Sequence, residues 1–207
     1  MNPVAGEGTR VHTADFRFKE IEHKFVVGDE FDRQQFGDVL ASLGPTRTHS
    51  IRVRDRYYLT EGGLARRFVI RHRCDAELQH LTIKTLEADT EVRDEVNLDL
   101  GLQAGDQAAP VEAFMARLGV RWSGTVQKDV DVWYFADCEV VHYLASTDAR
   151  SVRCVEFEAT RGHSLAEALA IVETFERATG FHGLVRSRVS LPQLLFPELS
   201  EILTGAS

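Results

Sequence analysis

The sequence predicts an α+β protein whose centre is an eight-stranded antiparallel β-barrel, closed or nearly closed, with helices covering its outside. Short segments of alternating apolar and polar residues recur along the chain, and such alternation is typical of strands. Four further segments repeat apolar residues at the helical spacing. Several strands align charged residues on one face. Because amphipathic helices can cover only the outer face of a closed barrel, the charged faces are expected to point inward.

The barrel is expected to form a single domain over residues 18–203. The chain has 207 residues, of which 43% are hydrophobic and 27% charged, enough for one sizeable core. Residues 1–17 are small, polar and without period, and predict a flexible leader. No apolar run approaches the ~20 residues that span a bilayer, and no signal peptide is evident. A cytoplasmic protein without membrane contact is therefore expected.

The elements are predicted in order along the chain. Strands are expected at 18–27, 51–59, 66–74, 79–86, 90–100, 125–135, 138–145 and 152–160. Helices are expected at 31–43, 107–118, 164–180 and, with a weaker pattern, 191–203. Residues 44–45, a Gly-Pro pair, end the first helix, residues 61–63 make a turn, and Ser164 and Gly180 bound the third helix.

The composition limits the partners. A formal net charge of -8 argues against a broad basic surface that would follow a nucleic-acid backbone, so nucleic acid is not an expected partner. A single RNA end could still enter a tunnel without such a surface. Cys74, Cys138 and Cys154 lie far apart without a CxxC pair, which predicts reduced thiols. The pattern leaves monomer and homodimer equally open.

The first and last predicted strands carry acids on one face. In the segment FKEIEHKFVV, a period of two places Glu20, Glu22 and Lys24 on one face, with the apolar residues on the other. The segment VRCVEFEA repeats the arrangement with Glu156 and Glu158. Two strands thus offer paired carboxylates.

The strands between them carry cations at the same period. These are Arg52, Arg54 and Arg56; Arg67, Arg71 and Arg73; Lys84; and Arg93. Each strand alone could present these residues to solvent, as sheets commonly do. Their repetition favours a shared interior, which cannot stay dry because unpaired buried charges cost several kcal/mol each. The interior is expected to hold water, ions and a charged ligand.

These residue types together indicate phosphate chemistry. Arginine forks bind phosphate oxygens in pairs, and several converging arginines suit a polyphosphate. Clustered glutamates would repel that ligand unless a hard divalent cation, Mg²⁺ or Mn²⁺, lay between them. Such a cation supports hydrolysis of a phosphoanhydride.

Other catalytic arrangements have less support. The chain lacks a GxSxG motif, and its eight histidines show no ligand spacing. His23 and His72 fall on the apolar faces of their strands, which predicts a structural role.

The segment EIEHK resembles the ExExK signature of the CYTH, or triphosphate tunnel metalloenzyme, superfamily. The segments RYYLT, FVIRHR, LTIK, VRDE and VEFE follow in the order, and at roughly the spacing, of that family's strands, and the resemblance covers about residues 18–195. It implies a tunnel of eight antiparallel strands that binds triphosphates. Acids on the first and last strands would hold the metal.

The resemblance also implies roles for individual residues. Glu20, Glu22, Glu156 and Glu158 would be metal ligands, and Glu20, Glu22 and Lys24 the catalytic group. The expected phosphate-binding set joins Arg52 and Arg54, taken from the alternation, to Arg71, Arg73, Lys84, Arg93, Lys128 and Arg188, taken from the resemblance. Glu95 would be the acidic neighbour of Arg93.

Three positions depart from the family pattern. Val130 stands where an arginine is common, and Arg188 stands where a lysine is usual. The segment CEVVHYL lacks an aspartate that many relatives carry, and offers His142 and Tyr143 instead. These departures bear on substrate choice and on any third acid at the metal.

The leading functional hypothesis is a divalent-metal-dependent triphosphatase that acts on inorganic triphosphate (tripolyphosphate) or on a related organic triphosphate. Thiamine triphosphate would need an aromatic such as Trp133 in the lumen, but the alternation favours Trp133 as a core residue. One alternative is a class IV adenylyl cyclase, which would release cyclic AMP and pyrophosphate. A second is a non-catalytic polyphosphate or nucleotide-binding module.

Overall fold

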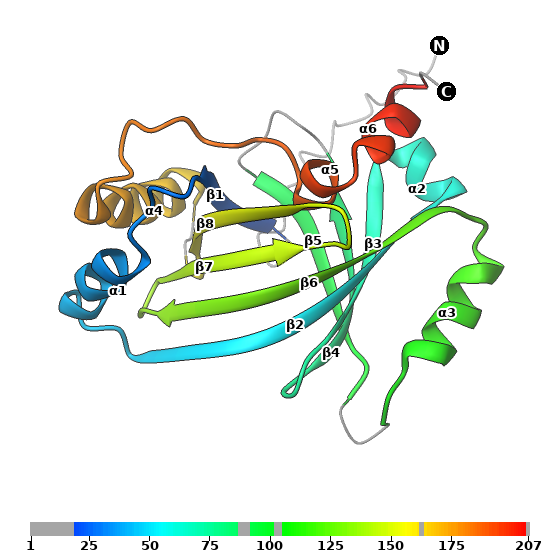
Figure 1. Ribbon diagram of the computed structural model, residues 1–207, viewed down its shortest axis with the longest axis horizontal. Coiled ribbons are helices and arrows are strands. Elements are labelled where there is room, and N and C mark those ends of the chain that lie inside the picture. The colour runs from blue at the N-terminus through cyan, green and yellow to red at the C-terminus, as the bar shows by residue number, and fades with distance from the viewer. Residues whose placement is uncertain (1–18, 87–91, 102–104, 162–163, 206–207) are drawn as a thin grey trace, which may run out of the picture.

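The computed structural model describes residues 19–86, 92–101, 105–161 and 164–205 (Figure 1). Its centre is a closed antiparallel barrel with the strand order β1-β5-β4-β3-β2-β6-β7-β8. The strands are β1 (Lys19–Val27), β2 (Arg47–Thr60), β3 (Phe68–Cys74), β4 (Gln79–Thr85), β5 (Val92–Asp99), β6 (Val120–Tyr134), β7 (Cys138–Ser146) and β8 (Ser151–Ala159). The predicted fold class is confirmed, while the expected leader at 1–17 lies outside the described residues.

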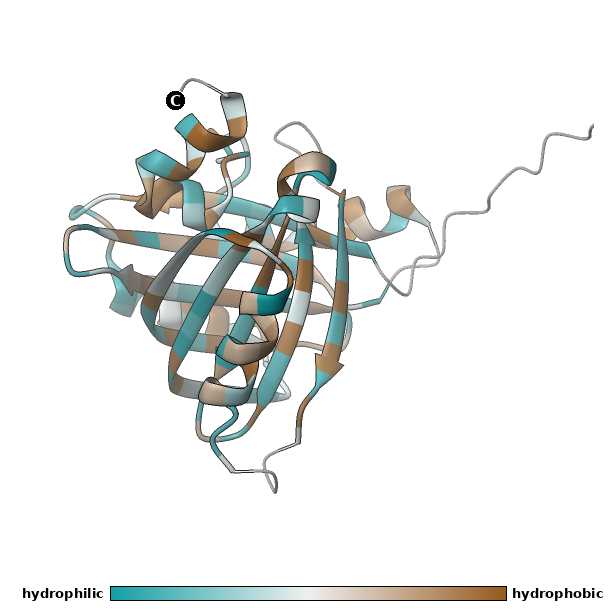
Figure 2. Cartoon of the chain, turned by 90° about the vertical axis from the view of Figure 1, so that its right-hand side faces the viewer, coloured by the Kyte–Doolittle hydropathy of each residue, from teal (hydrophilic) through white to brown (hydrophobic). Residues whose placement is uncertain are grey.

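The two longest strands, β2 and β6, form one continuous ladder. It runs from the pair Arg47 and Tyr134 to the pair Thr60 and Val120, with an irregularity at Leu59. β6 therefore begins five residues earlier than its alternation predicts, because its first residues still pair with the end of β2. Figure 2 shows hydrophilic and hydrophobic residues alternating along the strands, as expected for strands whose two faces meet different surroundings.

The helices begin and end at clear signals. They are α1 (Arg33–Ser42), α2 (Glu61–Arg66), α3 (Ala108–Arg117), α4 (Leu165–Thr179), α5 (Leu191–Leu195) and α6 (Pro197–Thr204). The Ser164 side chain accepts a hydrogen bond from the Glu167 amide and caps α4, which Gly180 ends with φ +81°, as predicted. No helix in the described part of the chain is long and apolar enough to cross a membrane.

Two segments differ from the prediction. Residues 61–66 form the short helix α2, because the Thr60 hydroxyl caps it and Arg67 closes it in the left-handed conformation, φ 55°. The tail predicted as one helix at 191–203 is two helices. Proline at position 197 cannot continue the hydrogen-bond ladder of α5, so the chain turns at Phe196.

Helices cover the outside of the barrel on two sides. α1 and α4 lie together over β1, β7 and β8 (Figure 1), where Phe25, Phe36 and Phe157 form a buried cluster. α3 packs through Met115 against the outer side chain of Tyr58. The apolar faces of these strands are therefore used outside the barrel, which leaves charged faces inside.

One end of the barrel interior is filled by the tail of the chain. Leu191 and Leu195 of α5 and Leu199 of α6 join a buried cluster that includes Tyr57 and Tyr143. Both tyrosines line the inner cavity. The interior thus consists of an apolar region beside α5 and α6 and a charged remainder.

Candidate functional site

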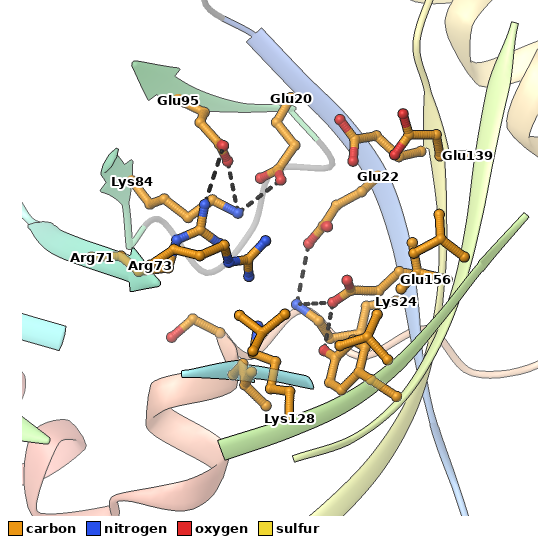
Figure 3. A pocket seen from close by; sticks show the side chains of 18 of the residues that line it. Glu20, Glu22, Lys24, Arg71, Arg73, Lys84, Glu95, Lys128, Glu139 and Glu156 are labelled. Atoms are coloured by element: carbon orange, nitrogen blue, oxygen red, sulfur yellow. Dashed lines mark hydrogen bonds and ion pairs between the residues drawn. The ribbon is translucent and has the colours of Figure 1, made fainter. Parts of the chain in front are cut away.

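The barrel encloses a cavity of about 300 Å³, lined by side chains from all eight strands and by the start of α5. This volume lies at the lower end of the range for small-molecule sites. Figure 3 shows glutamates, lysines and arginines from different strands pointing toward one another across it. The charged residues that alternation placed on one face of each strand meet here.

On β1, the inward side chains are Glu20, Glu22 and Lys24, each less than 9% exposed. The Lys24 ammonium lies 3.1 Å from Glu22 Oε1 and 3.1 Å from Glu156 Oε1, and Glu156 also accepts a hydrogen bond from Tyr143. Burial alone would raise the pKa of Glu22, but the surrounding cations, Lys24 first, lower that pKa to about 2. Glu22 is therefore a stable anion at neutral pH.

A second group of ion pairs joins β1, β3, β4 and β5. The Lys84 ammonium lies 2.8 Å from Glu20 Oε1 and 2.7 Å from Glu95 Oε2. Arg71 lies 3.6 Å from Glu95 and donates a hydrogen bond to the Thr82 hydroxyl. Burial opposes ionisation of Glu95, yet Lys84 and Arg71 together hold its pKa below the usual value.

A third group centres on Asp55, which sequence reasoning missed. Its carboxylate is fully buried and accepts two hydrogen bonds from Arg73, at 2.8 and 2.9 Å, and a contact from Lys128 at 2.7 Å. Burial lowers the pKa of Lys128 to about 8, although Asp55 opposes that shift. The sequence contains a signal for this residue: Asp55 lies between two arginines in the segment RDR, and a period of two places it on the opposite face of the strand from both.

Four carboxylates repel one another at one side of the cavity. Burial first, and then the charges of Glu20 and Glu22, raise the pKa of Glu158 well above its usual value. Burial and Glu22 raise the pKa of Glu20 to about 7. Glu139, paired with Glu158 across β7 and β8, points into the same space, and its pKa is raised by burial. Glu139 lines the cavity, and the sequence analysis did not single it out.

This cluster fits a hard divalent cation by its chemistry. Glu20 Oε2 is buried and has no hydrogen-bond partner among the described atoms. Burial and the neighbouring carboxylates raise the pKa of Glu158, and a cation bound among these acids would oppose that shift. The described side chains do not form a ready cluster of three or more metal donors. The nearest carboxylates are instead held by lysines and Arg93, with Arg93 2.5 Å from Glu22.

Most of the predicted site residues meet in the cavity. The described lining includes the four predicted glutamates and the cations Lys24, Arg71, Arg73, Lys84, Arg93 and Lys128. Glu95 also lines it, as expected.

Arg52 and Arg54 are corrections. Val53 and Tyr57 of β2 line the cavity, and the buried Asp55 shares their face. Both arginines therefore project outside, where the Arg52 side chain is 79% exposed and pairs with Asp129 at 2.9 Å. Arg188 is also exposed and does not belong to the cavity lining. The expectation that Arg52 and Arg54 line the lumen was wrong, since alternation fixes which residues share a face but not which face turns inward. The expectation for Arg188, taken from the resemblance, was wrong because this residue lies between α4 and α5 and not on a strand of the barrel.

The two histidines singled out from the sequence lie on outer faces. His23 is fully buried, with Nδ1 2.5 Å from Glu176 Oε1 of α4, and Arg186 contacts the other oxygen of Glu176 at 3.2 Å. His72 is buried as well. Both positions agree with the structural role predicted for them.

The fold and the lumen define a class of protein: an antiparallel β-barrel domain with a charge-lined interior. The family profile described as the CYTH domain matches residues 19–180. The chain therefore belongs to the CYTH domain family. This superfamily binds triphosphate substrates and generally depends on a divalent metal ion.

Solved structures share the fold at low identity. A conserved hypothetical protein from Pyrococcus furiosus is 20% identical, with a TM-score of 0.66 over 85% of this chain and 99% of that one. A putative adenylate cyclase from Bacillus halodurans is 17% identical, with a TM-score of 0.53 over 86% and 99%. A putative adenylyl cyclase from Hippeastrum, described as having a dominant triphosphatase activity, is 14% identical, with a TM-score of 0.56 over 90% and 96%. Comparison with curated proteins finds no match.

Proposed function

We propose that this protein is a divalent-metal-dependent triphosphatase that cleaves a phosphoanhydride bond of a bound triphosphate. The observation that carries the proposal is the convergence of lysines, arginines and glutamates from separate strands on one enclosed cavity. Family membership and the triphosphatase activity reported for the Hippeastrum protein support it.

The charge of the cavity explains why a metal is required. Among the described lining residues, eight acids outnumber six lysines and arginines. A polyanion entering this space would meet no excess of positive charge, so binding needs additional positive charge. The cations alone are insufficient because carboxylates already hold them.

The carboxylates best placed to hold Mg²⁺ or Mn²⁺ are Glu20, Glu22 and Glu158, with Glu139 beside them. Carboxylate oxygens are the donors that these hard cations prefer. A bound divalent cation would polarise the terminal phosphoryl group and lower the pKa of a water molecule.

The chain's own cations orient and neutralise the phosphates. Arg71 and Arg73 offer planar forks from β3, while Lys84 and Arg93 offer charge from β4 and β5. Each of these side chains can turn from its carboxylate partner to a phosphate oxygen while its strand stays in place. Lys24, between Glu22 and Glu156, holds these two carboxylates in place and adds positive charge near the transferred group.

The direct test is phosphate release by the purified full chain from tripolyphosphate and from ATP, with Mg²⁺ or Mn²⁺. Glu20→Gln and Glu158→Gln are expected to reduce turnover at least a hundredfold, whereas Asp129→Asn, on the exposed outer face of β6, is expected to leave it unchanged. Undiminished turnover in both glutamate variants would refute the assignment. Product analysis separates the cyclase, because that reaction yields cyclic AMP and pyrophosphate instead of free phosphate.

A further inference from the structure

The first half of β6 has a neighbouring strand on one side only. β2 pairs with β6 along its whole length, from Tyr134 to Val120. β7 pairs with it only from Tyr134 to Gln127, where Ser146 is the last partner. Figure 1 shows β6 running on past the arrow tip of β7. Within the described part of the chain, residues 122–126 therefore present an edge that no strand covers.

The register tells which backbone groups point out of this edge. Where β6 turns into β7, the amide of Phe135 donates to the carbonyl of Cys138. In an antiparallel pair, every second residue points both of its backbone groups at the same neighbour, so the odd-numbered residues of β6 face β7. Ser123 and Thr125 continue this series beyond the end of β7. Among the described residues, their N–H and C=O groups make no hydrogen bond.

A groove of about 780 Å³ runs along the same edge. Its lining includes the consecutive residues Ser123, Gly124 and Thr125, which belong to both faces of the strand. The groove therefore follows the edge of β6 and does not lie over one face. The turn between β7 and β8, at 147–150, and the turn between α5 and α6, at 195–198, bound it.

The two sides of the groove differ in chemistry. On the outer face of β6, Arg56 donates hydrogen bonds of 2.9 Å to the hydroxyls of Ser123 and Thr125. On the inner face, the Phe196 ring packs against Trp122 with ring centroids 5.0 Å apart. A strand lying in the groove would thus have hydroxyl groups beside one of its faces and an aromatic ring beside the other.

This edge lacks the usual protection against pairing. Exposed edges commonly carry a charged residue or a proline that prevents another strand from adding. Residues 122–126, with the sequence WSGTV, carry neither. The charged residues of the groove lining balance one another, two of each sign: Arg56, Arg150, Asp148 and Glu198. The groove therefore suits an uncharged extended segment.

We propose that the edge of β6 at Ser123 and Thr125 binds an extended segment of a partner protein, which adds to the barrel as an antiparallel strand in line with β7. The four backbone groups of these two residues supply the hydrogen bonds, and the two sides of the groove select alternating hydroxyl and apolar side chains. A second copy of this chain does not fit, because its own β6 edge is recessed between the same two turns. The site lies outside the lumen and does not depend on the proposed triphosphatase function.

The probe is the blocked heptapeptide acetyl-TVTFTVT-amide, titrated by calorimetry into the full chain. Bonded partners in an antiparallel pair lie on the same face, so the threonines of the peptide should bond Ser123 and Thr125. N-methylation of the two central threonines is expected to weaken binding at least tenfold. N-methylation of the phenylalanine and the valine after it should change binding less than about threefold, because those amides point to the opposite edge.

Two variants of one residue test the protein side of the contact. Thr125→Pro removes the N–H that faces the groove and leaves the ladder with β2 intact, so it should weaken peptide binding at least fivefold. Thr125→Val keeps that N–H and loses only the hydroxyl, and should bind as the wild type does. Ser123→Pro serves as a second variant should Thr125→Pro fail to fold. None of these changes touches the lumen, so phosphate release should stay as in the wild type.

Hydrogen exchange locates the bound peptide. The peptide should slow exchange at the amides of Ser123 and Thr125 and leave Gly124 and Val126, which face β2, unchanged. The inference is overturned if no binding is seen up to about 1 mM peptide, if the two methylated peptides bind equally, or if Thr125→Pro and Thr125→Val bind equally. A dimer in light scattering that Thr125→Pro dissociates would also contradict it, because the edge would then belong to a second copy.

Discussion

Replacing Asp55 by asparagine should destabilise the protein far more than removing the charge of an exposed ion pair on the outside of the barrel. The Asp55 carboxylate is fully buried and neutralises two cations, Arg73 and Lys128, through three contacts of 2.7 to 2.9 Å. Asparagine keeps the shape and one acceptor oxygen but removes the negative charge. The variant therefore leaves two cations facing each other in a largely enclosed space.

The size of the loss in the free energy of unfolding follows from the burial of Arg73 and Lys128. Removing one member of a buried ion pair costs about 3–5 kcal/mol. The Arg73 side chain, 26% exposed, recovers some hydration, whereas Lys128, 8% exposed, does not. For a chain of this length, such a loss lowers the melting temperature by roughly 6–20 °C.

The assay is urea denaturation at pH 7, with Asp129→Asn as the matched control. Asp129 pairs with Arg52 at 2.9 Å, but the two side chains are 63% and 79% exposed, so its loss should cost about 0–1 kcal/mol. A second readout is pH. Without Asp55 the pKa of Lys128 in the folded variant falls below about 8, so Lys128 of the variant loses its proton at a lower pH than in the wild type. The difference in the free energy of unfolding between wild type and variant should therefore narrow as the pH rises toward 8. Equal effects of the two substitutions would refute the reasoning.

Three further predictions concern single residues. Burial lowers the pKa of Lys128 to about 8, so the charge of this side chain is lost as the pH rises through 8. The affinity for triphosphate, measured by calorimetry, should then fall by up to tenfold per pH unit. The variant Lys128→Arg should remove this pH dependence, because arginine stays charged. Arg71→Ala should reduce kcat/KM for triphosphate at least tenfold, whereas Arg52→Ala should leave it unchanged; a loss in Arg52→Ala would contradict its exterior position. Phe157→Ala should cost about 3–5 kcal/mol in urea denaturation, because the side chain is fully buried under α4, and a loss below 1 kcal/mol would show that the cluster repacks.

The barrel could be predicted because three independent patterns agreed. Period-two alternation located the strands, helical periodicity located their cover, and the charged faces indicated an interior. The segment EIEHK also placed Glu20, Glu22 and Lys24 correctly in the lumen, since the outward residues between them are two buried side chains, Ile21 and His23.

The inward face of β2 could not be predicted in the same way. Its two faces read RxRxR and VxDxY, and both are partly covered, so alternation alone gave no reason to turn the arginines outward. The cross-strand partner decides: Asp129 of β6 neutralises Arg52 on the outside, while Arg73 of β3 neutralises Asp55 on the inside. Such partners depend on strand order, which the linear sequence does not state. The same limit hid Glu139, whose place depends on the pairing of β7 with β8.

Under the proposed function, the internal pairing of the lumen makes the binding of the metal ion and of the triphosphate interdependent. Lys84 is held by Glu20 and Glu95, and Lys24 by Glu22 and Glu156, so a phosphate that draws a lysine away frees a carboxylate, and a divalent ion that takes a carboxylate frees a lysine. Each ligand thereby prepares the site of the other. By thermodynamic reciprocity, the factor by which the ion tightens the anion equals the factor by which the anion tightens the ion. The metal ion and the triphosphate of the proposed function should therefore bind more tightly together than either binds alone.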